Sequence, residues 1–501
     1  MASSATQQRE EESLAVNGRP TVLDAAKPVV LNDVTAVEIA ATDPGRFATV
    51  LSRAQFAALS RTIERASRIF EGHRVWNINS TAAGGGVAEM LSTLLPYARG
   101  AGVDTGWLVI SGDDEFFTIT KRIHNRLHGA LGDGGDLTES DREHYETVLA
   151  HQAGQIRDQL RSGDIVILHD PQTAGLAPLL SSMDIAVLWR CHVGMDTPNA
   201  VARDTWAFLL PYVRAARMYV FSRQVFAWDG LDSERIRVIA PSIDPFSPKN
   251  CEMDDPAIQA VLAAAGVVTG GDGDPVFTRL DGRRDRVQHT ATMVEASPVD
   301  AATPLVVQVS RWDRLKDPLG VLEGFVHGVI PKCDAHLMLA GPNVQDVADD
   351  PEGAETYQEV VRRWECLESG ARSRVHLACL PMDDEEENAA VVNALQRRSQ
   401  VVVQKSIAEG FGLTVAEAMW KSRAVVASRI GGIQDQIEHC TSGYLLNDPT
   451  DEAEFASAVC TLLGDRRLAA RVGKRAHARV QDAFLGSRHL AEYVDLCAAL
   501  Q

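Results

Sequence analysis

The stretch V-V-V-Q-K-S-I-A-E-G-F-G-L-T-V-A-E, residues 401–417, joins a short apolar run to a glycine-containing turn and a helical pattern. The run V-V-V-Q has the length and composition of a strand that is buried on both faces. Gly410 and Gly412 permit a loop, and we expect a helix from about Leu413. A strand, a loop and a helix in this order form the repeating unit of a parallel α/β sheet.

The same unit recurs along the chain in two groups. Apolar runs of the first group lie at residues 75–79, 107–110, 164–169, 185–190, 218–221 and 236–239. Those of the second group lie at residues 305–309, 336–340, 374–377, 401–404 and 424–427. Continuous apolar strands that alternate with helices indicate parallel sheets covered on both faces. We therefore expect an α/β fold with two Rossmann-like parallel-sheet domains that face each other across a cleft.

A length of 501 residues also favours two domains. We expect an N-terminal extension at residues 1–70 and a first, acceptor-side domain at residues 71–250. Residues 251–303 are expected to be an insertion or linker, because residues 266–303 are rich in Gly, Asp, Arg and Thr and weakly periodic. The second domain is predicted at residues 304–480, followed by a helix at residues 481–501 that can pack back on the first domain.

Composition and charge exclude several classes of protein. The net charge of -19 argues against a nucleic-acid partner, which an acidic surface repels. Residues 1–20 are polar, and no run of about 18 apolar residues occurs, so we expect no membrane segment and a cytoplasmic location. The eight cysteines are scattered without a C-x-x-C pair, which favours reduced thiols over a zinc site or a disulfide framework.

A glycine-rich turn follows the first apolar run. Gly84, Gly85 and Gly86 let backbone N–H groups approach an anion at the N-terminus of the next helix. A tight turn between strand and helix explains these glycines equally well. Glu89 stands where the dinucleotide pattern G-x-G-x-x-G has its third glycine, so the turn does not favour a dehydrogenase.

Two cations follow the run at residues 305–309. Arg311 and Lys316 suit a diphosphate, because arginine donates forked hydrogen bonds and lysine supplies a compact charge. Such a pair is by itself more often part of a solvated surface. Its position at the carboxyl end of a predicted strand favours the diphosphate.

Two glutamates flank the turn in the stretch quoted first. Glu409 precedes the turn, and Glu417 lies about one turn into the helix, so the two are not a close acid–base pair. We expect Glu409 to accept hydrogen bonds from a sugar and Glu417 to accept them from a ribose, at two ends of one ligand. The alternative for Glu417 is an ordinary glutamate of the first helical turn. Backbone amides that can face a phosphate come from Gly410, Phe411, Gly412 and Leu413.

Asp170 and His192 each follow an apolar run of the first group, in H-D-P-Q and W-R-C-H. A lone histidine is usually a structural residue. Because these two residues come from strand ends of one predicted sheet, we expect them to share a site.

Together these segments resemble a known family. The resemblance rests on N-S-T-A-A-G-G-G-V-A-E (79–89), H-D-P-Q (169–172), W-R-C-H (189–192), P-S-I-D-P (241–245), residues 308–316 and E-G-F-G-L-T-V-A-E-A-M-W (409–420). These are similar to the trehalose glycosyltransferring synthases. They belong to the retaining GT-B glycosyltransferases, which also include glycogen synthases, sucrose synthases and fungal trehalose phosphorylases. The resemblance runs from about Val75 to the C-terminus.

The resemblance implies transfer of glucose from a nucleotide-diphosphate glucose to free glucose, giving α,α-trehalose with retention and without a metal or cofactor. It places Arg311 and Lys316 on the donor diphosphate and Glu409 and Glu417 on the donor sugar and ribose. Gly85 and Gly86 are expected to close over the diphosphate. The sugar-contacting residues are expected to be Asp170, His192 and Glu89. The residues expected to carry catalysis are His192, Asp170, Glu409, Arg311 and Lys316.

Retention without a well-placed nucleophilic carboxylate favours a front-face route, in which the leaving phosphate oxygen takes the acceptor proton. Trehalose phosphorolysis by inorganic phosphate is the alternative within the clan. A non-catalytic nucleotide-sugar-binding module is the alternative from another class. A homodimer is also compatible with the sequence.

Overall fold

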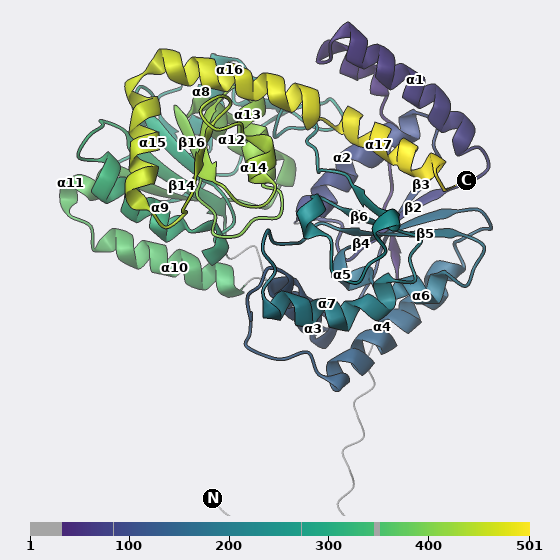
Figure 1. Ribbon diagram of the computed structural model, residues 1–501. Helices are drawn as coiled ribbons and strands as arrows, with labels where there is room; N and C mark the ends of the chain where they lie inside the picture. The colour runs from purple at the N-terminus through teal and green to yellow at the C-terminus, as the bar shows by residue number, and fades with distance from the viewer. Residues whose placement is uncertain (1–32, 84, 272, 345–350, 501) are drawn as a thin grey trace, which may run out of the picture.

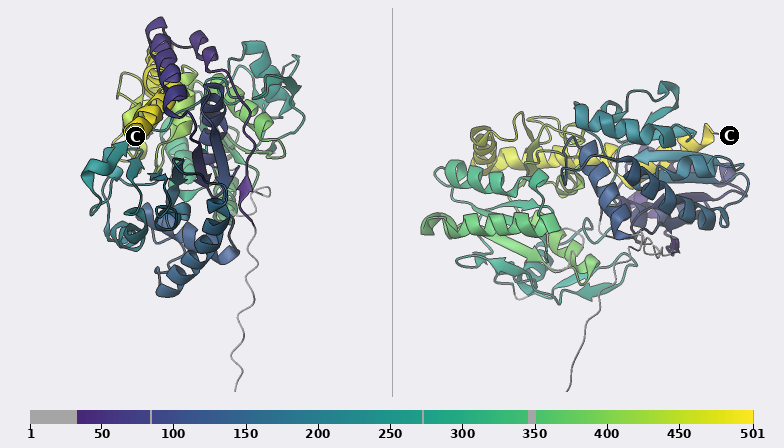
Figure 2. Two further views of the ribbon diagram at one scale, coloured as in Figure 1. Left: turned by 90° about the vertical axis from the view of Figure 1, so that its right-hand side faces the viewer. Right: turned by 90° about the horizontal axis from the view of Figure 1, so that it is seen from below.

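The computed structural model describes residues 33–83, 85–271, 273–344 and 351–500 (Figure 1). The polar residues 1–20 and Gly84 of the glycine turn lie outside the described residues. Two sheets, each with helices on both faces, form two domains that lie beside each other (Figure 2). The predicted architecture of two Rossmann-like α/β domains is confirmed.

A seven-stranded sheet forms the centre of the first domain, in the order β1-β3-β2-β4-β5-β6-β7. Its strands are β1 (Thr35–Ala36), β2 (Val75–Asn79), β3 (Thr105–Val109), β4 (Ile165–His169), β5 (Ala186–Cys191), β6 (Met218–Phe221) and β7 (Ile236–Val238). All neighbouring strands are parallel except β1, which pairs with β3 antiparallel. The sequence did not predict β1, because a strand of two residues has no measurable periodicity.

Helices cover both faces of this sheet. Val166 and Leu168 of β4 pack into the larger core cluster, whereas Ile165 and Ile167 pack into a second cluster with residues of the C-terminal helix. Alternate residues of one strand are thus buried on opposite faces, which explains its continuous apolar run. The helices are α1 (Arg53–Ile69), α2 (Gly86–Gly100), α3 (Asp114–Leu127), α4 (Glu139–Arg157), α5 (Asp170–Thr173), α6 (Leu176–Leu180) and α7 (Ala200–Val213), with 3-10 turns at Pro44–Thr49, Gln224–Phe226 and Ser233–Arg235.

The second domain has its own seven-stranded sheet, in the order β11-β15-β14-β13-β16-β17-β18. Its strands are β11 (Thr292–Val294), β13 (Leu305–Val309), β14 (His336–Pro342), β15 (Val375–Leu380), β16 (Val401–Gln404), β17 (Ala424–Ser428) and β18 (Tyr444–Leu446). Only β11 runs antiparallel to its neighbour in this sheet. Two small sheets are formed by the short strands that precede β13, which are β8 (Val268–Thr269), β9 (Val276–Thr278), β10 (Arg284–Arg286) and β12 (Val299–Asp300).

The helices of the second domain pack on its sheet and on one another. They are α8 (Asp255–Ala264), α9 (Pro318–Gly324), α10 (Pro351–Glu365), α11 (Ser369–Arg372), α12 (Glu385–Arg398), α13 (Leu413–Trp420), α14 (Ile433–Gln436), α15 (Glu452–Gly464) and α16 (Arg466–Ala483), with a 3-10 turn at Arg314–Lys316 and a π-helical turn at Phe325–Val329. Helix α8 packs against α12, and β11 extends the sheet. Most of the weakly periodic segment before β13 therefore lies on the second domain.

Near residue 485 the chain passes from the second domain back to the first. Helix α17 (Gly486–Ala498) continues from α16 and contacts α1 and α2 of the first domain (Figure 1). At the crossing, the N–H of Ile243 donates to the carbonyl of Phe484 at 2.9 Å, and that of Gly486 donates to the carbonyl of Ile243 at 3.1 Å. The two crossing segments thus lie side by side.

The strand orders fix where ligands can bind. In an open parallel sheet, a ligand binds outside the carboxyl ends of the strands at the point where the strand order reverses. That point lies between β2 and β4 in the first sheet and between β13 and β16 in the second. The residues that follow these four strands are Gly85, Asp170, Arg311 and Glu409.

Candidate active site

The turn between β16 and α13 has a backbone that only glycine adopts readily. Gly412 has a φ of 82°, and a side chain there would place its Cβ 2.9 Å from Ile433. A Cβ on Gly431 would overlap the carbonyl oxygen of Glu409, so two glycine-containing turns pack directly together. The amide of Gln436 donates to the carbonyl of Phe411 at 2.6 Å and fixes the turn from the side.

Glu409 forms an ion pair with Lys316, a contact that was not predicted from the sequence. The Nζ atom of Lys316 lies 2.6 Å from Oε2 of Glu409, and both side chains are largely buried. Arg311 is 53% exposed, and its guanidinium lies 3.3 Å from the carboxylate of Asp313. The structure thus brings Lys316 and Glu409 together from adjacent strands and leaves Arg311 at the solvent side of the same strand end.

Two histidines of the first domain face these cations and were not singled out from the sequence. His128 and His124 lie at the end of α3, and their rings are 5.1 Å apart. Burial, together with the charges of Lys316 and Arg311, lowers the pKa of His128 to about 4. Burial also lowers the pKa of His124 well below its usual value, with smaller contributions from neighbouring charges. Both rings are therefore neutral near pH 7.

Asp170 and His192 lie together at the ends of β4 and β5, as expected. The backbone N–H of His192 donates to Oδ1 of Asp170 at 2.7 Å. Asp170 has a φ of 63°, an uncommon conformation for a residue other than glycine, and the indole of Trp189 donates to its carbonyl at 3.1 Å. Burial raises the pKa of the Asp170 carboxyl to about 7, although the His192 N–H opposes this shift.

The His192 ring continues into a buried chain of hydrogen bonds. Its Nε2 lies 3.2 Å from Nδ1 of His169, and Nε2 of His169 lies 3.0 Å from Oδ1 of Asn77. Burial lowers the pKa of His169 to about 3, and burial with the charge of Arg190 keeps that of His192 well below its usual value. Burial and Arg190 thus keep the His192 ring neutral, and the hydrogen-bond chain fixes its orientation.

The strand ends of the two domains touch. A Cβ on Gly410 would lie 3.0 Å from the carbonyl oxygen of His192, so the Glu409 turn abuts the His192 strand end. A Cβ on Gly86 would lie 3.3 Å from the Leu413 side chain, which places the first glycine turn against the start of α13. Residues that the sequence assigned to opposite sides of one site are therefore neighbours.

Lys249, between the domains, joins Glu89 to Glu417. Its Nζ lies 2.8 Å from both carboxylate oxygens of Glu89 and 3.8 Å from Oε1 of Glu417. Burial works to lower the pKa of Lys249, but the charges of Glu89 and Glu417 outweigh burial and raise it. Oε2 of Glu417 is buried without a hydrogen-bond partner among the described residues. A carboxylate oxygen in this state is an acceptor for a ligand hydroxyl.

Burial also raises the pKa of Glu417, and Lys249 and Lys421 oppose that shift. Lys421 is buried and donates to Asn250 at 3.0 Å and to Gln396 at 2.9 Å. Burial lowers the pKa of Lys421 to about 7.

Within the described residues, no group of three or more His, Cys, Asp or Glu side chains could hold a metal ion. None of the helices in the same residues is long and apolar enough to cross a membrane.

The arrangement of two such domains is that of the GT-B glycosyltransferases. The solved α,α-trehalose-phosphate synthase (UDP-forming) from Burkholderia vietnamiensis superposes with a TM-score of 0.62 at 13% sequence identity. The superposition covers 86% of this chain and 99% of that chain. The fold predicted from the sequence is therefore confirmed as GT-B.

Sequence comparison narrows the class. Residues 77–228 match the family described as "Trehalose synthase, N-terminal domain", and residues 292–479 match "Glycosyl transferases group 1". The trehalose synthase of Rubrobacter xylanophilus is 34% identical over 439 residues, which are 87% of this chain and 92% of that protein. The chain belongs to the trehalose synthase family of glycosyltransferases. The predicted hexosyltransferase of trehalose metabolism is thereby confirmed.

The phosphorylase alternative has a more distant counterpart. The trehalose phosphorylase of Grifola frondosa is 24% identical over 431 residues, and the match covers 81% of this chain but 54% of that protein. The synthase is thus the better match in identity and in shared length.

Proposed function

We propose that this enzyme transfers glucose from a nucleotide-diphosphate glucose to the anomeric hydroxyl of free glucose, forming α,α-trehalose with retention. The observation that carries the proposal is the meeting of Lys316 and Glu409 at 2.6 Å, where the strand order of the second sheet reverses. This is where a parallel sheet binds a nucleotide-linked ligand.

The donor diphosphate is assigned to Arg311, Lys316 and the amides at the start of α13. Two positive side chains and a helix N-terminus match the charge of a diphosphate. One carboxylate oxygen of Glu409 contacts the ammonium group of Lys316, so the other oxygen can accept a hydrogen bond from a hydroxyl of the donor sugar. Because protein cations supply the positive charge at the diphosphate, we propose that the transfer needs no metal.

The ribose is assigned to Glu417, whose Oε2 is buried and without a partner among the described residues. Glu89 shares Lys249 with Glu417. We therefore place Glu89 at the ribose end of the donor and not beside the acceptor sugar, where the resemblance had placed it. In this position Glu89 holds Lys249, and Lys249 in turn lies beside the Glu417 carboxylate.

The sugars are assigned to the side formed by Asp170 and His192. Gly410 lies against the His192 carbonyl, so a sugar bound by Glu409 has the first-domain strand ends as its other wall. A neutral His192 ring and a carboxylate at Asp170 offer acceptors for sugar hydroxyls. We propose that these two residues contact the transferred and acceptor sugars.

We propose a front-face mechanism for the transfer. The bond between the anomeric carbon and the diphosphate oxygen breaks, and the acceptor oxygen forms the new bond on the same face. The acceptor proton passes to the departing phosphate oxygen. Arg311, Lys316 and the turn amides stabilise the negative charge that develops on that diphosphate.

Product analysis tests the proposal. The enzyme is incubated with glucose and a panel of nucleotide glucoses, and separately with trehalose and inorganic phosphate. We expect trehalose and a nucleoside diphosphate from at least one donor. Cleavage of trehalose that depends on phosphate, without transfer from any donor, would contradict the proposal and favour the phosphorylase. Binding of a nucleotide glucose without any product would favour a non-catalytic module.

A pair of neighbouring arginines provides a matched test of the diphosphate site. Arg311→Ala should lower kcat/KM at least about a hundredfold, because one of the cations on the leaving group is lost. Arg314 lies three positions away in the sequence and pairs with Glu359 at 2.7 Å, so Arg314→Ala should retain activity. Equal activity of the two variants would contradict the role of Arg311.

A further inference from the structure

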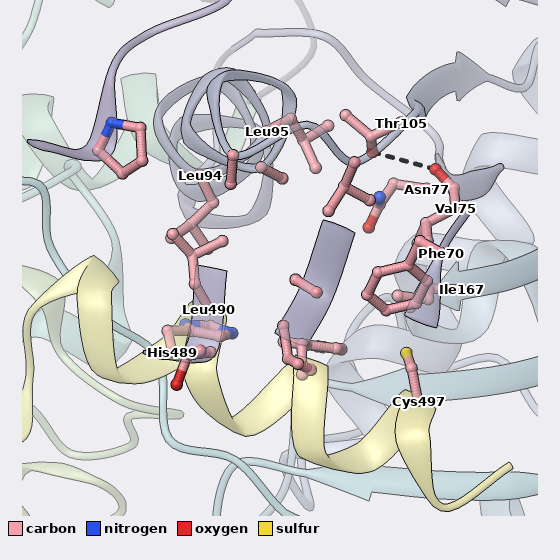
Figure 3. A pocket seen from close by; sticks show the side chains of 18 of the residues that line it. Phe70, Val75, Asn77, Leu94, Leu95, Thr105, Ile167, His489, Leu490 and Cys497 are labelled. Carbon is pink, nitrogen blue, oxygen red and sulfur yellow. Dashed lines mark hydrogen bonds between the residues drawn. The ribbon is translucent and has the colours of Figure 1, made fainter. Parts of the chain in front are cut away.

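A cavity lies inside the first domain, on the side of the sheet that α1, α2 and α17 cover. It has a volume of about 90 Å³ and is lined by α1, α2, α17 and the strands β2, β3 and β4 (Figure 3). Most of its lining is aliphatic or aromatic, as Leu94, Leu95 and Phe70 illustrate. Thr62, Ile63 and Leu490 also line it and are only half-buried, so solvent reaches the cavity between α1 and α17.

Two polar atoms in the cavity lining are buried and lack a hydrogen-bond partner among the described residues. His489 is 1% exposed, and its Nδ1 lies 2.9 Å from the hydroxyl of Ser242. Its Nε2 has no hydrogen-bond partner among the described residues, and the same holds for the hydroxyl of Tyr493, one helical turn along α17. A buried polar atom without a protein partner is costly, so water or a bound compound is expected to satisfy it.

The state of the His489 ring determines which chemical group fits. Burial keeps the pKa of His489 well below its usual value, so the ring is neutral. In a neutral imidazole one nitrogen donates and the other accepts, and the Ser242 hydroxyl can serve either role. A hydroxyl group likewise donates and accepts, and it therefore satisfies Nε2 in both tautomers. A carboxylate or an ammonium ion satisfies only one tautomer and carries a charge into an apolar space.

We propose that this cavity is a binding site for a small uncharged compound with an apolar body and one hydroxyl group, such as a phenol or a short alcohol. An apolar cavity of ~150 Å³ holds benzene in another protein. The cavity here is smaller but opens to solvent between α1 and α17, so an apolar body of about six or seven non-hydrogen atoms extends into that opening. The apolar body contacts the leucines of α2, and the hydroxyl lies at His489 and Tyr493 on α17.

The cavity shares one wall with the candidate active site. Asn77 and His169 line it, and His169 is hydrogen-bonded to His192. The binding proposal does not depend on the proposed function, because binding is measured without any sugar or nucleotide.

Calorimetric titration of the full-length enzyme with phenol and with toluene tests the proposal, because toluene has the same shape without the hydroxyl. We expect phenol to bind at a single saturable site at least about tenfold more tightly than toluene, because only phenol satisfies the buried polar atoms. Absence of saturable phenol binding, or toluene binding as tightly as phenol, would overturn the proposal.

Substitutions on α1 test the location. Ala66 lines the cavity and is buried, whereas Ala58 on the same helix is exposed and does not line it. Ala66→Leu fills the space and should weaken phenol binding at least about tenfold, whereas Ala58→Leu should leave it unchanged. A folded Ala66→Leu variant that binds phenol like the wild type would overturn the assignment. If Ala66→Leu does not fold, Ala98→Leu, which fills the same cavity from α2, replaces it.

Discussion

Lys249 lies at the boundary between the two domains, where its positive charge is close to a carboxylate of each domain. Its ammonium group contacts Glu89 of the first domain and lies near Glu417 of the second. A cation between two carboxylates lowers the cost of burying both of them. Glu417 can then remain ionised in a buried place where it accepts hydrogen bonds from a ligand.

Replacement of this lysine should weaken donor binding. We expect Lys249→Met to raise the KM for the nucleotide donor about tenfold, equivalent to about 1.4 kcal/mol, with a smaller effect on kcat. Loss of the positive charge also raises the pKa of Glu417 further, so the KM of the variant should rise more steeply as the pH falls. Steady-state kinetics at several pH values measure both effects. Lys332→Met, at an exposed lysine, is the control. A donor KM equal to that of the wild type would contradict the role of Lys249.

Ionisation of the Asp170 carboxyl should make the activity of the enzyme depend on pH near neutrality. Its pKa is raised to about 7, and we assign it a role as an ionised acceptor of sugar hydrogen bonds. The carboxylate is lost as the pH falls through that value, so kcat/KM should rise about tenfold from about pH 6 to about pH 8. Asp170→Asn should lower activity and remove this rise. Persistence of the same profile in the variant would assign the titration to another group.

The residues of the site were predictable to the extent that they follow apolar runs. Asp170, Arg311 and Glu409 each lie in the segment that follows a strand whose composition marks it as buried, and parallel strands bring such ends together. Lys249 and His128 do not follow an apolar run, so the sequence pattern did not indicate them. Lys249 lies in a connecting segment without periodicity, and its partners come from helices of both domains.

At the level of elements, the turn before α13 depends on a backbone conformation that the sequence indicates through its glycines. Gly412→Ala forces a Cβ toward Ile433 at a φ of 82°. We expect the free energy of unfolding to fall by about 1–3 kcal/mol, and donor binding to weaken because the amides at the α13 N-terminus shift. Urea denaturation measures the stability of the variant.

Gly154 is the matched control for this substitution. It lies inside α4, and a Cβ there meets nothing within 4 Å. Gly154→Ala should therefore raise the stability by about 0.5–1 kcal/mol. A Gly412→Ala variant as stable as Gly154→Ala would show that the turn tolerates a side chain.

The inner parallel strands were predictable, whereas β7 was the only one of the four described edge strands that the sequence indicated. Every apolar run named in the sequence overlaps a strand. In the inner strands, burial on both faces leaves this continuous pattern, whereas the residues of β7 are half-buried or exposed. The edge strands β1 and β11 have two and three residues, and their residues are mostly exposed or half-buried. Pairing with a neighbouring strand defines such strands, and that neighbour is distant in the sequence.

At the scale of the whole molecule, one arginine ties the two domains at the active-site edge. Arg223 of the first domain forms ion pairs with Asp196 of its own domain and with Asp435 of the second. Asp196 also accepts the N–H of Gly431 at 2.9 Å. The segment at residues 431–436 is thus held from across the domain boundary.

Loss of this tie should loosen the segment without unfolding either domain. We expect Arg223→Gln to increase amide hydrogen exchange several-fold at residues 431–436, because local opening becomes less costly. Mass spectrometry of exchanged peptides measures the rate. Arg214→Gln is the control, since Arg214 donates to Gly230 within the first domain. Unchanged exchange in Arg223→Gln would mean that other contacts hold the segment.

The domain limits, the homodimer, the lack of a nucleic-acid partner and the cytoplasmic location stay predictions from the sequence.

A chelator tests whether the transfer is independent of metal. The activity should be unchanged in its presence, because Arg311 and Lys316 supply the charge at the diphosphate. Abolition by the chelator, with recovery on adding a divalent cation, would contradict it.

The decisive measurement is a nuclear magnetic resonance spectrum of the product formed from unlabelled glucose and a nucleotide glucose labelled with carbon-13 at its anomeric carbon. We predict α,α-trehalose with one labelled ring, together with one nucleoside diphosphate for each trehalose formed. A labelled β-linked product, or release of labelled free glucose without any disaccharide, would contradict a retaining synthase.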